Sequence, residues 1–169
     1  MAEISIEPFD RAKHQRASFR CGKPALDEFI RTLVTQYEKR RLGKTFVAVR
    51  TDDLATVVGY YTLASGAVAC ANLPSNVARK LPQHPIPVVL LARLAVDRSV
   101  QGQRVGETLL GDALQRAATL SKSLGVFAVE VLAIDERAAT FYAKYGFVPL
   151  LDDPRHLFLP ISAIEAAIP

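Results

Sequence analysis

Apolar side chains recur at intervals of three and four residues between positions 24 and 38, and polar side chains occupy most of the positions between them. This spacing places the apolar residues on one face of a helix. The pattern therefore predicts an amphipathic helix over Pro24 to Glu38 that ends before Gly43. Its apolar face comprises Leu26, Phe29, Ile30, Leu33, Val34 and Tyr37.

Two later segments have the same periodicity. One follows a glycine-containing loop, and the other runs from about Glu136 to Tyr145 and ends at Gly146, which suits a left-handed helix cap. A helical tail is expected after Pro160. The helix after the loop is expected to stop at Gly125. Its expected buried face comprises Val105, Leu109, Ala113, Leu114, Ala117 and Leu120.

Runs of apolar and β-branched residues predict strands. Asp52-Asp53 is expected to join the first two strands as an antiparallel hairpin, and a strand, helix and strand later in the chain form a right-handed βαβ unit. The proline-rich segment Asn72 to Pro87 predicts a loop with a short helical turn at Ser75 to Lys80. The expected strands are Thr45 to Arg50, Val57 to Ala64, Val88 to Val96, Val126 to Leu132, Phe147 to Leu150 and His156 to Leu159.

This order of elements predicts a single domain over residues 1–169, with an α/β fold (α+β in character) in which helices flank a central mixed sheet. The chain is 50% hydrophobic and 22% charged, which is typical of soluble globular proteins. No segment has the length of a signal peptide or membrane span, so we expect a cytoplasmic protein without membrane attachment. Cys21 and Cys70 fit no metal or redox spacing; both are expected to be buried bystanders, and no metal site is expected.

The loop Gln101-Gly-Gln-Arg-Val-Gly106 joins a strand directly to a helix. Backbone N–H groups at such a junction have no partner within the helix and lie at the positive end of its dipole, so they favour a phosphate. Glu107 replaces the lysine of a nucleotide-triphosphate loop, and the glycine spacing is not that of a dinucleotide site. An ordinary loop-to-helix cap is the alternative. The expected phosphate-binding residues are Gln101, Gly102, Gln103, Arg104, Val105, Gly106 and Glu107.

This loop resembles the pyrophosphate-binding motif of the GNAT acetyltransferases, with Gln101 and Gly106 matching and Arg104 standing where glycine is usual. We expect Arg104 to be sterically tolerated at a helix start and able to reach a phosphate. The segment from Asp135 to Phe147 resembles the closing motif of the same family, in which Asp135 replaces an asparagine and Tyr142 matches a tyrosine. The resemblance implies a GNAT fold and acetyl-CoA as cosubstrate, with Asp135 among the cofactor-binding residues.

A narrower resemblance links the chain to the acetyltransferase toxins of bacterial toxin–antitoxin pairs. It rests on Phe19-Arg-Cys-Gly, Leu26-Asp-Glu-Phe29, Gly59-Tyr-Tyr-Thr-Leu63 and Leu91-Ala-Arg-Leu-Ala-Val-Asp97. In that subfamily the α-amine of an amino acid charged on tRNA is acetylated, which blocks translation. The resemblance implies aminoacyl-tRNA as substrate and a ribbon-helix-helix antitoxin as partner, and it leaves a homodimer open.

The expected chemistry needs a polarised thioester carbonyl and a proton for the departing thiolate. A bulged strand edge at Leu94, Ala95 and Val96 is expected to offer an N–H group to the carbonyl oxygen. Tyr142 stays protonated at neutral pH and is the expected general acid, although a packing role for Tyr142, or transfer of its role to Tyr145, is left open. The reactive strand carries no obvious base, which favours an α-amine, with a pKa of about 7.7–8.0, over a lysine.

Basic residues are the expected contacts to a polyanionic substrate, and the formal net charge is +4. Arg93 is a charge in an otherwise apolar strand, so it is expected to bind the acceptor end of the RNA or to form a structural salt bridge. The outer contact is expected to be the cluster of Lys39, Arg40, Arg41 and Lys44, with solvated helix ends as the alternative. Acetylation of a protein or small-molecule amine is the second functional reading. A non-catalytic CoA-binding or partner-binding module is the third.

Overall fold

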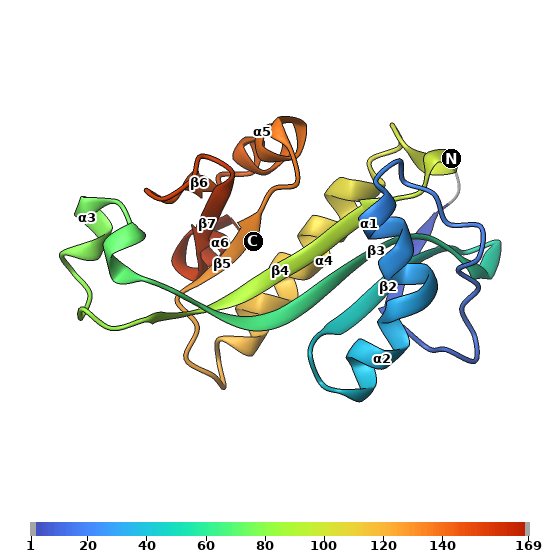
Figure 1. The fold of residues 1–169 in the computed structure, drawn as a ribbon, viewed down its shortest axis with the longest axis horizontal. Coiled ribbons are helices and arrows are strands. Elements are labelled where there is room, and N and C mark those ends of the chain that lie inside the picture. Colours follow the sequence, from blue (N-terminus) through green and yellow to red (C-terminus); the bar gives the residue numbers. More distant parts are fainter. Residues whose placement is uncertain (1–2, 168–169) are drawn as a thin grey trace. The chain divides into compact units, whose positions relative to one another are not determined.

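The computed structural model describes residues 3–167, so residues 1, 2, 168 and 169 of the expected domain lie outside the described part. The described chain forms two compact units (Figure 1). Unit 1 comprises the described residues up to Ala64 together with Ala92–Ala113, and unit 2 comprises Ser65–Leu91 and the described residues from Leu114. The expectation of one domain over the whole chain stays a prediction.

The strands form a seven-stranded sheet in the order β1-β2-β3-β4-β5-β7-β6. β4 and β5 are parallel, as the βαβ pattern predicted, whereas β1–β2, β2–β3, β5–β7 and β6–β7 are antiparallel. The mixed α/β sheet is therefore confirmed. The strands are β1 (Ile4–Pro8), β2 (Lys44–Arg50), β3 (Asp53–Val68), β4 (Ile86–Val96), β5 (Ala128–Leu132), β6 (Val148–Pro149) and β7 (His156–Pro160).

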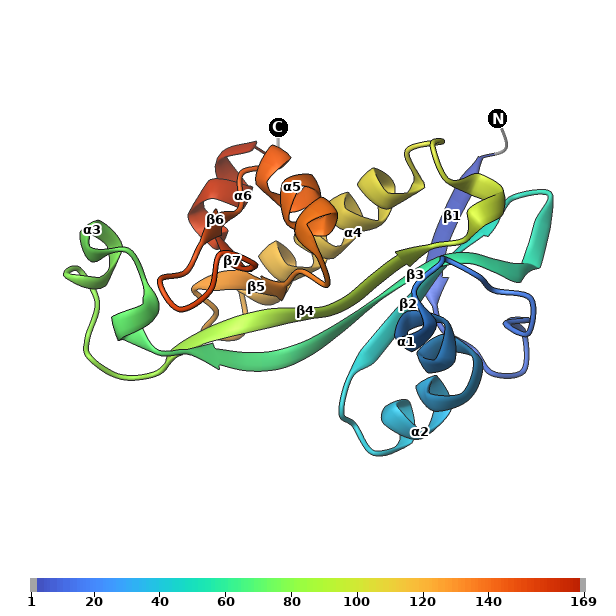
Figure 2. The same cartoon turned by 45° about the horizontal axis from the view of Figure 1, so that its top comes forward.

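Unit 1 contains the expected N-terminal helix, but the helix is not a uniform α-helix. It consists of α1 (Pro24–Glu28), a π-helical segment η1 (Phe29–Leu33) and α2 (Val34–Lys39). Figure 2 shows α1 and α2 beside β2. The helical face and the sheet bury one core, so the predicted apolar face packs as expected. This core contains Phe19, Phe29, Ile30, Val34, Val47, Val49, Val57, Tyr60 and Ala95.

Helix α4 (Val105–Leu120) begins directly after the glycine-containing loop. Its expected face is partly wrong, because Leu120 is 41% exposed and Leu114 is only half-buried, while Leu110 and Ala118 are buried. Leu120 is the last residue of the helix, where fewer neighbours cover a side chain. The helix also ends five residues before Gly125, in a turn over 121–123.

Unit 2 contains α5 (Glu136–Lys144), α6 (Ile161–Ala167) and α3 (Ser75–Ala78), which is the short helical turn expected in the proline-rich loop. Gly146 has a φ of 97° directly after α5, so the predicted left-handed cap is confirmed. The core of this unit comprises Val68, Leu73, Ile86, Val88, Ala128, Leu150 and Phe158. Among residues 3–167, every helix is too short or too polar to cross a lipid bilayer.

Candidate functional site

The side chains of Asp97 and Gln101 hold the segment that follows β4 in place. Asp97 precedes the 3-10 turn η3 (Arg98–Val100), and its carboxylate accepts hydrogen bonds from the backbone N–H groups of Ser99 at 3.0 Å and Arg20 at 2.7 Å. The side-chain amide of Gln101 donates to Val96 O at 3.1 Å and Cys21 O at 3.0 Å. The structure therefore brings the glycine-containing loop, the end of β4 and the segment near Cys21 together. The Gln101 side chain acts as an anchor of the loop.

Not all of the expected N–H donors of this loop are free for a ligand. The N–H groups of Gln101 and Gln103 donate within the loop, to Arg98 O at 3.4 Å and Val100 O at 3.3 Å. The first helical bond of α4 runs from Thr108 N to Arg104 O, so three earlier N–H groups precede the hydrogen-bond ladder. These belong to Val105, Gly106 and Glu107. Two of the seven expected N–H donors, those of Gln101 and Gln103, are therefore already used inside the protein.

The backbone of the loop turns at two residues with positive φ, Gly102 at 81° and Arg104 at 62°. Arg104 therefore occupies the left-handed region, which side chains other than glycine, asparagine and aspartate rarely adopt. Arg104 was expected to be sterically tolerated, and the turn holds it in a backbone conformation that is strained for a residue with a side chain. Glycine, which is usual at this position of the motif, adopts the left-handed conformation without strain. Arg104 keeps the turn and adds an exposed cation to it.

Residues Leu94, Ala95 and Val96 end β4. The pairing of β4 with β5 covers only Val88–Leu90 of the described strand, so these three residues lie beyond it. In unit 1, Gly59 of β3 comes close to them. A Cβ atom added to Gly59 would lie 3.3 Å from Ala95 O and 2.9 Å from Leu109 of α4. The glycine thus permits close packing of β3, the end of β4 and the helix. The expected role of these N–H groups toward the thioester stays a prediction.

Asp135 and Tyr142 lie in unit 2, on the helix α5 that the closing motif predicts. Asp135 is the N-cap of this helix, and its carboxylate accepts a hydrogen bond from Ala138 N at 2.8 Å. Tyr142 is buried and packs edge-on against Phe147, with ring centres 5.5 Å apart. Burial raises the pKa of Tyr142, so the phenol stays neutral and able to donate a proton at physiological pH.

Arg93 lies in unit 1 with its guanidinium over two aromatic rings, 3.8 Å from the centre of Phe29 and 5.1 Å from that of Tyr37. The rings belong to η1 and α2, so the helix covers the charge that β4 carries. A structural salt bridge was the alternative to RNA binding for Arg93. Within residues 3–167, Arg93 forms no ion pair with a carboxylate. The expected contact to the substrate stays a prediction.

The basic cluster of Lys39, Arg40, Arg41 and Lys44 lies at the end of α2 and the start of β2. All four side chains are exposed, as a contact to a polyanion requires. Lys44 also forms an ion pair with Glu38 at 3.8 Å, which offsets part of its charge. The cluster therefore offers three cations, Lys39, Arg40 and Arg41, that form no ion pair within residues 3–167.

The cysteines are half-buried rather than fully buried, and neither forms a disulfide. Burial, together with a hydrogen bond to Asp27, raises the pKa of Cys21 to about 11, so this thiol is unreactive at neutral pH. In the described part of the chain, no group of histidine, cysteine and carboxylate side chains is arranged to hold a metal ion.

Comparison with known proteins agrees with this geometry. Residues 41–149 match the acetyltransferase (GNAT) domain family. A tRNA-acetylating toxin of Mycobacterium tuberculosis is 40% identical over 151 residues, which cover 89% of each chain. The structure of AtaT complexed with acetyl-methionyl-tRNAfMet is 35% identical, with a TM-score of 0.90, and the match covers 97% of this chain and 98% of that one.

A third relative is a tyrosine-to-phenylalanine mutant of the AtaT toxin, bound to the C-terminus of the antitoxin AtaR and to acetyl-CoA. It is 31% identical with a TM-score of 0.83, and the match covers 96% of each chain. The expected family is thus confirmed both by sequence and by fold. The chain belongs to the GNAT acetyltransferase family and is a homologue of the tRNA-acetylating toxins.

Proposed function

We propose that this protein is an acetyl-CoA-dependent N-acetyltransferase that acetylates the α-amine of an aminoacyl-tRNA and so acts as a toxin on translation. The observation that carries the proposal is the similarity to the tRNA-acetylating toxin, which is 40% identical over 89% of the chain. The structure of AtaT with acetyl-methionyl-tRNAfMet supports the same substrate class. The cytoplasm, where charged tRNA is found, is the proposed location.

The start of α4 fits the pyrophosphate of acetyl-CoA. Three consecutive N–H groups, from Val105 to Glu107, precede the helical ladder, and the left-handed turn at Gly102 and Arg104 leads into them. Such donors at a helix N-terminus favour an anion. The exposed guanidinium of Arg104 adds a mobile cation beside them. Acetyl-CoA supplies the acetyl group as a thioester, and its sulfur leaves as a thiolate.

The residues of the chain then have separate tasks in the transfer. An N–H group of Leu94 to Val96 stabilises the negative charge that develops on the carbonyl oxygen. The Tyr142 hydroxyl donates its proton to the departing sulfur, a thiolate whose conjugate acid has a pKa of about 8.5. The attacking α-amine, with a pKa of about 7.7–8.0, is partly neutral at pH 7 without a protein base. The proton that its nitrogen loses as the amide forms passes to solvent, and solvent returns a proton to the Tyr142 oxygen.

An antitoxin is the proposed protein partner, because a relative is bound to the C-terminus of an antitoxin. The ribbon-helix-helix class of this antitoxin and a homodimer of the toxin stay predictions. A ribbon-helix-helix reading frame next to the gene is the expected companion.

The experiment that tests the function is transfer of labelled acetyl from acetyl-CoA to total charged tRNA, with deacylated tRNA, histone, peptide and polyamine as parallel acceptors. Label is expected on charged tRNA alone, and mild alkaline hydrolysis should release it as an N-acetyl amino acid. Preferential labelling of a peptide lysine or of a polyamine would instead identify a general amine acetyltransferase. No transfer to any acceptor, with acetyl-CoA still bound, would identify a binding module.

A further inference from the structure

A groove of about 280 Å³ in unit 1 is lined by four cations and by polar side chains. Arg11 and Arg16 come from the loop after β1, whereas Arg31 and Lys39 come from the helix η1–α2. The remaining lining residues are Thr32, Thr35 and Gln36. We name this site the basic groove. Its lining contains neither an acidic nor an apolar side chain, which is the composition of a site for an anion.

Two of the guanidinium groups are held in place by backbone carbonyls. Arg16 donates to Ile30 O at 3.2 Å, and the Nε atom of Arg31 donates to Phe19 O at 2.9 Å. The π-helical segment contributes to the first contact, because Val34 N donates to Phe29 O instead of to Ile30 O. A π-helical turn of this kind is frequent at functional sites. The groove therefore presents fixed donors.

Within residues 3–167, the charges of the basic groove have no carboxylate as a counterion. None of the four cations forms an ion pair with a carboxylate in the part of the chain that the structure describes. Burial lowers the pKa of the Arg16 guanidinium, and repulsion by the charge of Arg11 lowers it further by a smaller amount. A bound anion would relieve this repulsion.

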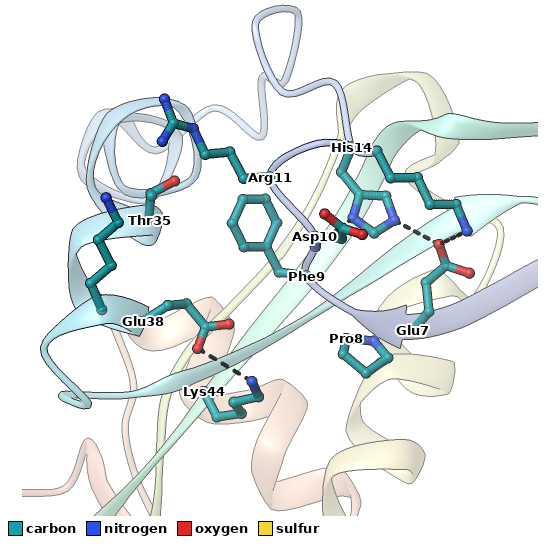
Figure 3. Close-up of a pocket in the computed structure, with 11 residues that line it drawn as sticks. Glu7, Pro8, Phe9, Asp10, Arg11, His14, Thr35, Glu38 and Lys44 are labelled. Atoms are coloured by element: carbon teal, nitrogen blue, oxygen red, sulfur yellow. Dashed lines mark hydrogen bonds and ion pairs between the residues drawn. The ribbon is translucent and has the colours of Figure 1, made fainter.

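Two acidic side chains of a neighbouring pocket are paired with other groups. A larger pocket shares Arg11, Thr35 and Lys39 with the basic groove. Its acids include Glu7, which contacts Lys13 at 2.7 Å and His14 at 2.6 Å, and Glu38, which contacts Lys44. Figure 3 shows these pairs as dashed lines, and it shows the Arg11 side chain extending from its loop toward the helix that carries Thr35.

We propose that the basic groove binds backbone phosphates of the tRNA, through residues other than those assigned to the acetyl transfer. The proposal rests on the proposed function and adds the place where the RNA backbone is held. Guanidinium groups, hydroxyls and an amide are the donors that phosphate oxygens accept. A peptide would instead need apolar anchors, and the groove has none. Such contacts hold RNA without reading its sequence.

The test compares two double variants that remove the same charge. Arg11→Gln/Lys39→Gln removes the two exposed cations of the groove and leaves the anchored guanidiniums in place. Arg50→Gln/Lys122→Gln removes two exposed cations outside it. Binding of labelled, uncharged total tRNA is measured by fluorescence anisotropy over a range of salt concentrations, and acetyl-CoA binding is measured by calorimetry.

The groove variant is expected to weaken tRNA binding by roughly tenfold or more near 0.1 M salt, and to reduce the salt slope by about 1.5–2, since two phosphate contacts are lost. Acetyl-CoA affinity should stay as in the wild type. The proposal is overturned if the groove variant binds tRNA like the control variant. It is also overturned if polyglutamate competes as well as polyuridylate of equal length, because the groove then serves an acidic peptide.

The binding assay separates this proposal from the proposed function. Suppose that the wild type transfers no acetyl to charged tRNA, but the groove variant still loses tRNA affinity. The proposed acetylation of aminoacyl-tRNA is then rejected, and the proposal that the basic groove binds tRNA is retained. Suppose instead that the wild type acetylates charged tRNA, and that both double variants do so with the same Michaelis constant for charged tRNA. The proposal for the basic groove is then rejected, and the proposed acetylation of aminoacyl-tRNA is retained.

Discussion

The guanidinium of Arg93 lies 3.8 Å from the centre of the Phe29 ring, so the one charged side chain of β4 rests on an aromatic ring instead of a carboxylate. Phe29 is in turn fixed in the core, where it stacks on Tyr60 with ring centres 5.9 Å apart. An aromatic ring stabilises a cation without neutralising it. The charge of Arg93 is therefore stabilised by the ring but is not neutralised.

Arg93→Lys is expected to lower the free energy of unfolding by about 1 kcal/mol, because an ammonium group does not stack as a flat guanidinium does. Urea denaturation of Arg93→Lys, Phe29→Leu and the double variant measures the coupling between the two residues. A coupling of roughly 0.5–1 kcal/mol is expected. Strictly additive effects would show that the contact contributes nothing to stability.

Gly59, which packs against α4, and Gly111, which lies within α4, differ in the space available for an added Cβ atom. A Cβ atom at position 59 would lie 2.9 Å from Leu109, whereas one at position 111 meets nothing within 4 Å. Gly59→Ala is therefore expected to destabilise the protein by about 1–3 kcal/mol. Gly111→Ala, within the helix, should stabilise it by up to about 1 kcal/mol. Thermal unfolding of both variants checks this, and equal shifts would contradict the close approach at Gly59.

The periodic parts of the fold could be predicted from the sequence, because helices and central strands bury whole faces of apolar residues. The edge strand β1 could not, since all five of its side chains are half-buried or exposed and leave no clear alternation. The π-helical segment adds only one residue to a helical turn, and the spacing of apolar residues in the sequence does not distinguish it from an α-helix. It becomes visible only in the hydrogen bond from Val34 to Phe29.

The sequence predicted the candidate site only where the residues of the site are contiguous in the chain. The loop from Gln101 to Gly106 and the helix of Tyr142 are contiguous motifs. By contrast, the basic groove is assembled from Arg11, Arg16 and Arg31, which are separated by loops whose path depends on tertiary contacts. The positive φ of Arg104 was missed because the glycine of the family motif, which signals this conformation, is replaced here.

Arg104 can be tested by separating its backbone conformation from its charge. Asparagine also tolerates the left-handed region, so Arg104→Asn should leave stability nearly unchanged, whereas Arg104→Val should destabilise the protein by about 1–2 kcal/mol. If the guanidinium assists the pyrophosphate, Arg104→Asn raises the Michaelis constant for acetyl-CoA by up to about tenfold. An unchanged constant would assign binding to the backbone alone.

His156 predicts a pH dependence of stability. Burial lowers its pKa, but hydrogen bonds to Asp152, at 2.9 Å, and to Glu130 raise it more, so the net pKa lies above the ordinary value of 6.5. Because the folded pKa exceeds the unfolded one, this stabilisation is complete below pH 6.5 and is lost as the pH rises through the folded pKa.

Urea denaturation between pH 5.5 and 9 measures this loss. His156→Gln should remove the decrease in stability above pH 6.5, whereas His84→Gln, at an exposed histidine, should keep it. A wild-type curve that stays flat, or a curve that keeps its slope in His156→Gln, would rule out the linkage to His156.

Tyr142→Phe tests the proposed general acid with the smallest change of packing. The ring keeps its contact with Phe147, so stability should change little, while acetyl transfer should fall by about 10²–10⁴. Because burial raises the pKa of Tyr142, wild-type transfer should show no alkaline decline from this group up to pH 9. Tyr145→Phe, at the residue that caps the C-terminus of the same helix, is the control and should retain activity. The opposite result, full transfer by Tyr142→Phe and loss in Tyr145→Phe, would move the proton donor to Tyr145.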